Sequence, residues 1–448
     1  MSDAVSDAQS GVAKDAAAPP IAQPASGQPT SGQPTAPQPT APSPHAGKPR
    51  LTIVVTNDTF APEVNGNATF AGTLAAGLAS RGHDVHVAVP AYDNRKLGPQ
   101  RETHFGEEFT VHRIYSWRWY PHPWLRFALP WRIKQNAAKI LDRVKPDAIH
   151  FNSHIITGRG FSVEGQKRGI RIIGTNHFMP ENLADYTAII PPFFMAKAFK
   201  MAWDAADRTF VRAERMTTPT RKAAQYLEAN TSIDGVLAIS CGLHIDRYRP
   251  SLEPKTGNEI VFLGRVVEEK RIDVLIRAVA QLDPARGAHL TILGGGDQLE
   301  RMKQLATRLG VNDRIRFAGF VDDEQKLAAL GSAKVFAMPS IAELQSISTM
   351  EAMASALPVV AADAMALPHL VHDGENGILY EPGNVDELAE KLTRVLTMPR
   401  DEYLAMQRES LSIVQGHDIE RTLDVFETLY RAESVDESMV VRSHPVAD

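Results

Sequence analysis

The sequence has a single cysteine, Cys241, among its 448 residues. One thiol excludes an internal disulfide and excludes metal sites built from several cysteines, and it fits a reducing cytoplasm. No window offers the roughly 18 uninterrupted apolar residues that a spanning helix needs, so we expect any membrane contact to be peripheral. Basic residues are not in excess, with 48 Lys and Arg against 53 Asp and Glu. This balance argues against a dedicated nucleic-acid-binding protein.

Residues 1–48 contain no aromatic residue and are rich in proline. Within them, 26–40 reads SGQPT, SGQPT and APQPT, three copies of a five-residue unit. Proline lacks a backbone donor, and Ser, Thr, Gln and Gly bury little surface. We therefore predict a disordered tail over 1–48, inert rather than a docking peptide, and a second flexible tail over 435–448.

The rest of the chain alternates short apolar runs with amphipathic segments. LTIVVT at 51–56 is typical of a strand buried on both faces, and Phe70, Leu74 and Leu78 follow at helical spacing. The alternation restarts near residue 258 with EIVFLG. Strand, helix and strand in this order make a βαβ unit, and both parts contain several such units.

Two such parts in one chain predict an α/β protein with two Rossmann-like domains facing a cleft, over 49–240 and 241–415. A helical segment over 416–434 carries an apolar stripe, and we expect it to pack across both domains. Loops that follow strands should hold the functional residues, because ligands bind at the carboxyl ends of strands in such sheets.

Charged residues follow the first strand of the second domain. Gly264 and Arg265 come directly after EIVFL, and Lys270 lies just beyond. A guanidinium and an ammonium at the end of a strand can clamp a diphosphate. Taken alone, such residues are more often simply exposed.

Two acids lie in the segment PSIAELQSISTMEAMASALPVV. Glu343 precedes a helix and can accept hydrogen bonds from sugar hydroxyls. Glu351 lies inside that helix, where an acid can reach ribose hydroxyls. The backbone amides near Ser346 begin the helix, a position that favours an anion. Val321 ends a loop, 319–321, that could hold a base ring through backbone groups.

Together and in this order, these features resemble glycosyltransferase family 4, which has the two-domain GT-B fold. The resemblance covers residue 51 to about 432 and is strongest at Gly264-Arg265, Glu269-Lys270, the E-x7-E pair and DGENGILYEPGN. It implies a retaining hexosyltransferase that uses a nucleotide-diphosphate sugar, a UDP-sugar rather than a GDP-sugar, and no metal or other cofactor.

By the same resemblance, Arg265 and Lys270 grip the donor diphosphate, Glu343 binds the transferred sugar and Glu351 the ribose. The loop between the two acids begins Leu344-Gln345-Ser346 where the family usually has Gly-Phe-Gly. That form resembles members that glycosylate diacylglycerol, and it implies a membrane lipid as acceptor. The implied donor-binding set is Gly66, Gly264, Arg265, Lys270, Val321, Glu343, Leu344, Gln345, Ser346 and Glu351.

Histidines follow two strands of the first domain. His150 and His154 lie in DAIHFNSHIITG, and His177 lies in GTNHFMPENL. The family keeps a His beside the reacting sugar carbon, and here either His150 or His154 could fill that place. We favour His154 because it lies further beyond the strand, and we assign His177 to the acceptor side. A metal is not expected, because no D-x-D motif occurs.

The stretch 113–145 holds eight Arg or Lys, one acid and four of the five tryptophans. Aromatic rings favour the headgroup zone of a membrane, and basic side chains attract anionic lipid. A buried aromatic core with a solvated basic face, or a nucleic-acid surface, remains an alternative. The candidate acceptor and membrane residues here are Arg118, Trp119, Trp124, Arg126, Trp131 and Arg132.

The sequence thus predicts a peripheral protein on the inner face of the cell membrane that binds a nucleotide-sugar, a lipid acceptor and an anionic membrane surface. Transfer to a soluble acceptor and a non-catalytic sugar-nucleotide-binding scaffold stay open. A dinucleotide-dependent oxidoreductase would need G-x-G-x-x-G after a first strand, and neither domain has it.

Overall fold

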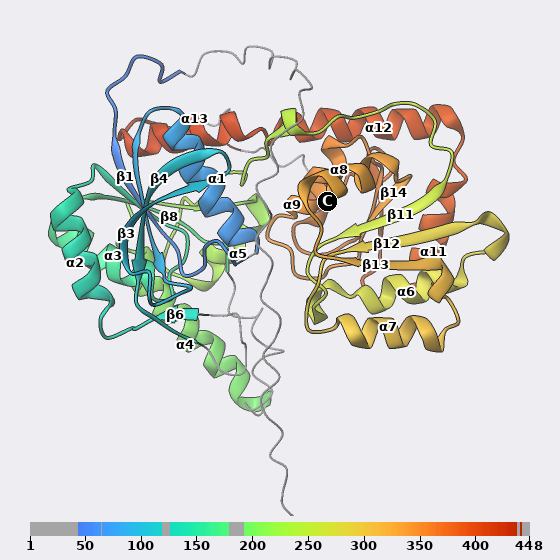
Figure 1. Cartoon of the computed structure of the whole chain (residues 1–448), viewed down its shortest axis with the longest axis horizontal. Helices are drawn as coiled ribbons and strands as arrows, with labels where there is room; N and C mark the ends of the chain where they lie inside the picture. The colour runs from blue at the N-terminus through green and yellow to red at the C-terminus, as the bar shows by residue number, and fades with distance from the viewer. Residues whose placement is uncertain (1–43, 64, 119–125, 179–191, 437–439, 441–448) are drawn as a thin grey trace, which may run out of the picture. The chain divides into compact units, whose positions relative to one another are not determined.

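A computed structural model of the chain describes residues 44–63, 65–118, 126–178, 192–436 and 440. The described residues form two halves, each built on a largely parallel β-sheet with helices packed against it (Figure 1). The predicted α/β architecture with two Rossmann-like domains is confirmed.

The first half contains an eight-stranded sheet in the order β10-β9-β8-β7-β1-β2-β4-β3. All neighbouring strands are parallel except β3 and β4, which form a hairpin. The strands are β1 (Thr52–Thr56), β2 (Asp84–Pro90), β3 (Gly98–His104), β4 (Glu107–Ile114), β7 (Ala148–Phe151), β8 (Arg171–Thr175), β9 (Arg215–Thr218) and β10 (Leu237–Ala238). The predicted central strand at 51–56 is β1, which lies between β2 and β7. It is apolar because both of its faces are buried: Ile53 and Val55 pack in one core cluster and Val54 in another.

No pattern in the sequence predicts the β3–β4 hairpin, because β3 is polar (GPQRETH) and partly exposed. Its two-residue turn has φ values of +53° at Phe105 and +88° at Gly106, the backbone of a type I′ hairpin turn. A further short antiparallel pair joins β5 (Ser116–Arg118) and β6 (Arg126–Ala128).

Capping residues mark both ends of the first helix of this half. Asn65 caps α1, its side chain accepting from the amide of Ala68, and Gly82 at φ +86° follows the end of that helix. The helices are α1 (Gly66–Ser80), α2 (Ile133–Val144), α3 (Thr157–Lys167), α4 (Pro192–Phe210) and α5 (Arg221–Asn230).

The second half contains a six-stranded parallel sheet in the order β13-β12-β11-β14-β15-β16. Its strands are β11 (Asn258–Leu263), β12 (Ala288–Leu293), β13 (Ile315–Gly319), β14 (Val335–Met338), β15 (Val359–Ala362) and β16 (Gly377–Tyr380). Its helices are α6 (Ile272–Gln281), α7 (Leu299–Arg308), α8 (Asp323–Ser332), α9 (Ile347–Ala354), α10 (Leu367–Leu370), α11 (Val385–Leu396) and α12 (Arg400–Gln415).

The loops that leave β11, β12 and β13 are bound to one another at the carboxyl end of this sheet. The amide of Gly264 donates to Leu293 O at 2.9 Å, and the amide of Gly294 donates to Gly319 O at 2.7 Å. Gly294 has a φ of +132°, and a Cβ there would lie 2.0 Å from Gly264 O. The glycine run after β12 therefore serves the close approach of two loop backbones.

The C-terminal part of the chain divides between the two cores. Tyr403 and Val414 of α12 belong to the core of the second half. By contrast, α13 (Ile419–Tyr430) packs in the core of the first half with Phe70 of α1 (Figure 1). A Cβ on Gly77 of α1 would lie 2.6 Å from Leu423, so a glycine there lets the two helices approach closely.

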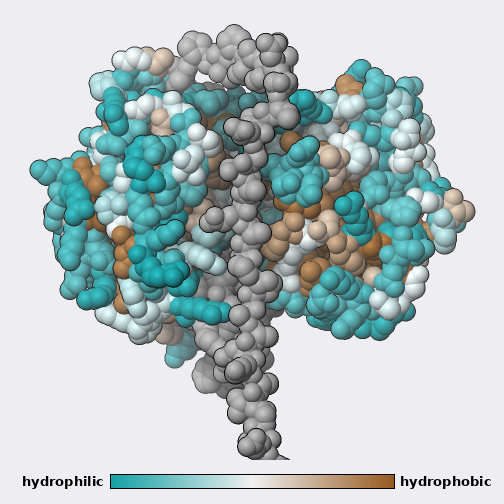
Figure 2. All heavy atoms as spheres, viewed as in Figure 1, coloured by the Kyte–Doolittle hydropathy of each residue, from teal (hydrophilic) through white to brown (hydrophobic). Residues whose placement is uncertain are grey.

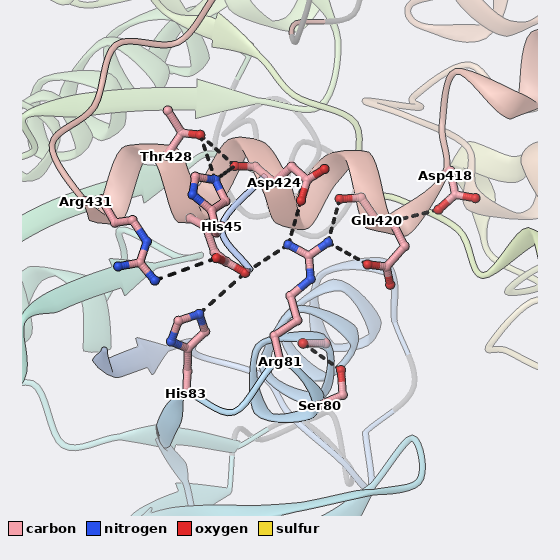
Figure 3. A network of polar contacts seen from close by, with 11 residues as sticks. His45, Ser80, Arg81, His83, Asp418, Glu420, Asp424, Thr428 and Arg431 are labelled. Atoms are coloured by element: carbon pink, nitrogen blue, oxygen red, sulfur yellow. Dashed lines mark hydrogen bonds and ion pairs between the residues drawn. The ribbon is translucent and has the colours of Figure 1, made fainter. Parts of the chain in front are cut away.

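A network of charged groups fixes α13 to the end of α1 (Figure 3). Arg81 binds Glu420 at 2.5 Å, Asp424 at 2.8 Å and Glu427 at 2.9 Å. His83 lies 3.5 Å from the same carboxylate of Glu427.

Residues assigned to the tail also contact α13, which corrects the predicted boundary at residue 48. His45 is buried and lies 3.1 Å from both Asp424 O and Thr428 Oγ1, while Lys48 binds Glu433 at 2.8 Å. The proline-rich composition concealed these two polar side chains. The partners of His45 lie on α13, and the partner of Lys48 lies just beyond the end of that helix. The rest of the predicted tail, 1–43, lies outside the described residues.

The predicted C-terminal tail begins closer to the core than expected. Val435 packs against the core of the first half. Residues 437–439 and 441–448 lie outside the described part of the chain.

Candidate functional site

The strongest cluster of functional side chains lies between the loops after β11 and β14. Lys270 closes a short 3₁₀ turn, η3 (Glu268–Lys270), and its Nζ donates to Glu343 Oε1. The Lys270 and Glu343 side chains are 14% and 9% exposed, so the ion pair is largely shielded from water. The structure thus brings together two of the predicted site residues from positions far apart in the sequence.

The backbones of these two loops are also joined. The amide of Ile341 donates to Glu269 O at 3.0 Å, and Ser340 Oγ donates to the same carbonyl at 3.4 Å. Arg265, at the start of the first loop, donates to the Glu269 carboxylate at 3.1 Å. These contacts hold Arg265 and Lys270 in one loop structure against the loop that carries Glu343.

Glu351 lies on α9 and is held by two donors. Tyr248 OH and Lys326 Nζ each donate to Glu351 Oε1 at 2.7 Å. Burial alone would lower the pKa of Lys326, but the carboxylates of Glu351 and Asp323 raise it, and so the ammonium stays charged. Sequence reasoning missed Tyr248 and Lys326, because these residues lie far from Glu351 in the sequence and meet it only in the folded chain.

Gly66 and Val321, two further predicted donor residues, have different surroundings. A Cβ at Gly66, the first residue of α1, would meet no atom within 4 Å. Val321 packs partly buried against the core of the second half, whereas its neighbour Phe320 is exposed. The ring of Phe320 lies against Gly295, where a Cβ would come within 2.8 Å.

The side chains of Leu344 and Gln345 contact the first half and the chain segment that connects the halves. Leu344 packs against the cluster around Trp203, and its carbonyl accepts from Thr220 Oγ1 at 3.1 Å. Gln345 accepts from the amide of Cys241 at 2.7 Å. Ser346 precedes the first residue of α9, as predicted, and its hydroxyl accepts from Thr349.

His150 and His154 have different surroundings. His150 lies within β7, with ring nitrogens 2.5 Å from Tyr430 OH and 2.7 Å from Thr175 Oγ1. Burial lowers its pKa to about 3, so it is neutral at pH 7. These two hydrogen bonds inside the core fit a structural role.

His154 lies beyond the strand and is also buried. Burial lowers its pKa to about 4, although Asp58 and Asn176 act in the opposite direction. Among the described residues, no group hydrogen-bonds its Nδ1. Phe210 contacts the ring edge-on, with centroids 4.9 Å apart. His154 is therefore a neutral imidazole whose buried Nδ1 has no hydrogen-bond partner among the described residues.

Asp58 organises the His154 loop and was missed in the sequence. Its carboxylate accepts from Ser153 Oγ at 2.5 Å and from the amides of Ile156 and Thr157 at 3.1 Å and 2.9 Å. Both amides lie at the start of α3, where backbone donors lack helical partners. The available signal was its position, two residues after the first predicted strand.

His177 follows β8, and its ring lies on that of Phe70 with centroids 4.5 Å apart. The centroid of the Phe70 ring also lies 6.4 Å from that of the His150 ring. His177 therefore lies near the end of β7 and β8, on the same aromatic side chain as His150.

The basic aromatic stretch is partly on the surface. Trp131 is 64% and Trp117 48% exposed, and their rings meet edge-on with centroids 5.5 Å apart. Arg118 and Arg132 are exposed, while the Arg126 guanidinium lies over the ring of Tyr92 at 5.4 Å. The predicted residues Trp119 and Trp124 lie outside the described residues.

A hollow of about 230 Å³ adjoins Trp131. Its lining includes Ile155 of the His154 loop and the basic residues Lys134 and Arg159. The face drawn in Figure 2 is mostly hydrophilic on the first half, while apolar residues gather in a larger area on the second half. An apolar wall with two cations thus lies next to the loop that carries His154.

The described residues contain neither a membrane-spanning helix nor a cluster of metal-ligating side chains. No helix there is long and apolar enough to cross a bilayer. Likewise, three or more His, Cys, Asp or Glu side chains do not gather anywhere in that part of the chain as a metal site would require.

Comparison with known proteins gives two family matches that follow one another along the chain. The family described as Glycosyltransferase Family 4 matches residues 64–247, and the one described as Glycosyl transferases group 1 matches 245–410. Their junction lies in the segment that connects the two halves.

Two curated relatives illustrate the range of similar proteins. The D-inositol 3-phosphate glycosyltransferase of Nocardia farcinica is 32% identical over 203 residues, 41% of this chain and 45% of the relative. The phosphatidyl-myo-inositol mannosyltransferase of Mycobacterium leprae is 36% identical over 163 residues, 35% of this chain and 43% of the relative. The chain therefore matches less than half the length of either protein.

Among solved structures, Anabaena HepE in complex with UDP and glucose has a TM-score of 0.66 and 19% identity. The match covers 85% of this chain and 99% of HepE, and it shows a common fold. The two family matches together run through both halves, and the sheet order and the solved structure agree with them. The chain therefore belongs to glycosyltransferase family 4 and has the GT-B fold.

Proposed function

We propose that the protein is a retaining, metal-independent glycosyltransferase that transfers a hexose from a nucleotide-diphosphate sugar to a membrane lipid such as diacylglycerol. The observation that carries the proposal is the shielded Lys270–Glu343 pair, beside Arg265, at the carboxyl end of the second sheet. Ligands of open α/β sheets bind at this edge. Family membership supports glycosyl transfer as the chemistry of such a site.

In this proposal the donor diphosphate takes the place of Glu343 as the partner of Lys270. The released Glu343 carboxylate then accepts hydrogen bonds from hydroxyls of the transferred sugar. Arg265 and Lys270 stabilise the charge that develops on the leaving diphosphate, and such preorganised charge is usually the largest contribution to catalysis. The diphosphate accepts the proton of the acceptor hydroxyl, so no side chain acts as the nucleophile.

Glu351 is proposed to bind the ribose. Because Tyr248 and Lys326 both donate to one oxygen of Glu351, its second oxygen is available to ribose hydroxyls. UDP is favoured over GDP, which is consistent with the UDP bound to HepE.

His154 is proposed to lie beside the reacting sugar carbon. Because burial lowers its pKa to about 4, the imidazole is neutral at pH 7 and adds no charge that would oppose the developing positive charge on the sugar. The hydrogen bonds of Asp58 to the same loop would fix its position.

A lipid acceptor is supported by the exposed Trp117 and Trp131, together with the exposed Arg118 and Arg132. Aromatic rings at the headgroup level and basic side chains near anionic lipid both favour attachment to a membrane surface. The mycobacterial relative is named as a phosphatidyl-myo-inositol mannosyltransferase, and phosphatidyl-myo-inositol is a lipid. We therefore propose a peripheral location on the inner face of the cell membrane.

A soluble acceptor is the second candidate, favoured by the relative named for D-inositol 3-phosphate. The hollow beside Trp131 contains Lys134 and Arg159, and it could also receive a phosphate-bearing small molecule. A scaffold that only binds a sugar nucleotide is disfavoured, because binding alone does not need the charge of Arg265 and Lys270 that is proposed to stabilise a leaving diphosphate.

One assay separates these candidates. The purified protein is incubated with UDP-glucose and either diacylglycerol in anionic vesicles or inositol 3-phosphate, and the product is identified by mass spectrometry and NMR. We expect an α-linked glycolipid, together with vesicle binding that falls with salt and is weakened by Trp131→Ser and Arg132→Ser. Arg101→Ser, a change at an exposed ion pair on β3, serves as the control. Transfer to the soluble acceptor alone would contradict the lipid proposal.

A further inference from the structure

The two segments that connect the halves run side by side. The first, 240–243, follows β10, and the second, 417–419, joins α12 to α13. The amide of Leu243 donates to His417 O at 2.8 Å, and the amide of Ile419 donates to Leu243 O at 3.0 Å. We call these segments the crossovers. Because these segments join the halves, any movement of one half relative to the other must change their conformation.

Gln345 contacts both crossovers with its amide group. Its Oε1 accepts from the backbone amide of Cys241 at 2.7 Å, and its Nε2 donates to Ser240 Oγ at 3.1 Å. His417 Nδ1 lies 2.9 Å from Ser240 Oγ and 3.4 Å from Gln345 Nε2. Gln345, Ser240 and His417 are all buried. A buried polar group that is fully hydrogen-bonded specifies one arrangement of its neighbours.

The same loop carries Glu343, two residues before Gln345. Its backbone is held from the first half, because Leu344 O accepts from Thr220 Oγ1 at 3.1 Å. From the second half, the amide of Ala366 donates to Glu343 O at 3.1 Å. The position of the Glu343 carboxylate therefore depends on contacts to both halves and to the crossovers.

We propose that Gln345 is a positioning residue that couples the crossovers to the donor loop, so that donor binding, the arrangement of the crossovers and the placement of Glu343 change together. The inference rests on the proposed donor site. It also assigns a structural role to Gln345 in Leu344-Gln345-Ser346, the sequence that stands where the family usually has Gly-Phe-Gly. In this proposal the Gln345 amide binds the chain that joins the halves, and Gln345 is a positioning residue in place of the donor ligand that the family resemblance implied.

Gln345→Met tests the coupling, because it keeps the size of the side chain and removes both hydrogen bonds. Gln407→Met is the matched control. Gln407 is also a buried glutamine, and it donates to Ala356 O at 3.0 Å and Ser251 O at 3.2 Å, both outside the loop that carries Glu343. Ser240→Ala is a second, milder variant that leaves the Cys241 contact in place.

The readout is hydrogen–deuterium exchange of the full chain with and without UDP. In the unmodified protein we expect UDP to slow exchange both in the clamp loop, 264–271, and in the crossover 240–243. In Gln345→Met the clamp loop should keep its protection, while the UDP-dependent change at 240–243 disappears. Ser240→Ala should reduce that change, and Gln407→Met should preserve it.

Turnover of UDP-glucose gives an independent readout. Because Gln345→Met misplaces Glu343 without touching the nucleotide, we expect kcat to fall about tenfold or more. The Kd for UDP should stay within about threefold. A purely structural role would lower Tm alone, as we expect for Gln407→Met.

The outcomes are distinguishable. If UDP protects neither segment in the unmodified protein, the proposed donor site fails and the coupling fails with it. If UDP protects the clamp loop but not 240–243, or protects 240–243 equally in Gln345→Met, the donor site stands and the coupling is overturned. A parallel loss of UDP affinity and kcat in Gln345→Met would make Gln345 a donor ligand, which also overturns the inference.

Discussion

Replacing Arg81 by Met removes the guanidinium that fastens α13 to the end of α1 (Figure 3). The Arg81 side chain is 12% exposed, and its most buried partner, Glu427, is 2% exposed. Methionine can keep the apolar contacts of the arginine stem, so the change isolates the charge. The substitution therefore leaves a buried carboxylate with fewer partners.

The size of the effect follows from burial. Burial alone would raise the pKa of Glu427, but hydrogen bonds from His83 and Arg81 lower it to about 2. Breaking a buried ion pair by removing one partner costs about 3–5 kcal/mol. His83 at 3.5 Å and Arg431 at 3.9 Å remain near Glu427, so we expect a loss near the lower limit, about 3 kcal/mol.

The assay is chemical denaturation of the full chain at pH 7, with hydrogen exchange of α13 as a local readout. Arg101→Met is the matched control, because Arg101 and its partner Glu108 are 55% and 57% exposed. Exposed pairs contribute only about 0–1 kcal/mol. The double variant Arg81→Met, Glu427→Gln should recover part of the loss, because it removes the unpaired charge. If Arg81→Met costs no more than Arg101→Met, the network does not hold α13 and this reasoning is wrong.

Three further predictions concern other parts of the chain. Burial lowers the pKa of His150 from 6.5 to about 3, so below pH 6.5 the unfolded chain binds a proton that the folded chain does not. Between pH 6.5 and 5, stability measured by urea denaturation should fall by about 1.6 kcal/mol more than in His150→Gln; equal losses in the two proteins would contradict this. Asp58→Ala should cost about 1–2 kcal/mol through loss of its bonds at the start of α3 and should leave the Kd for UDP unchanged, which calorimetry would check. Gly294→Ala places a Cβ 2.0 Å from Gly264 O, so its Tm should fall and its UDP affinity should weaken, whereas an unchanged melting curve would refute the close approach.

Features encoded by local pattern were predictable from the sequence. The apolar run at 51–56 is β1, because a parallel strand that is buried on both faces is apolar throughout. Gly264, Arg265 and Lys270 follow the apolar run EIVFL, so they could be placed after the end of a buried strand. The E-x7-E spacing then identified Glu343 and Glu351 as acids of one loop and helix.

Features that depend on distant contacts were not predictable. The hairpin strand β3 is polar, and its partner β4 alone explains it. His45 lies in a proline-rich stretch and gains its place only from α13. The surroundings of Gln345 depend on the packing of two crossovers that are far apart in the sequence. For His45 and Gln345 the deciding partners lie more than 70 residues away, beyond the reach of periodicity.

The donor site is the central claim, and binding of UDP to clamp variants tests it most directly. Isothermal titration calorimetry would compare the unmodified protein with Arg265→Ala and Lys270→Ala. Lys303→Ala, at an ion pair on α7, is the control. Hydrogen bonds to charged groups contribute about 1.5–3 kcal/mol, so each clamp variant should weaken UDP binding about tenfold or more. The control should bind as the unmodified protein does. If the unmodified protein does not bind UDP, or if both clamp variants bind it unchanged, the proposed donor site is contradicted.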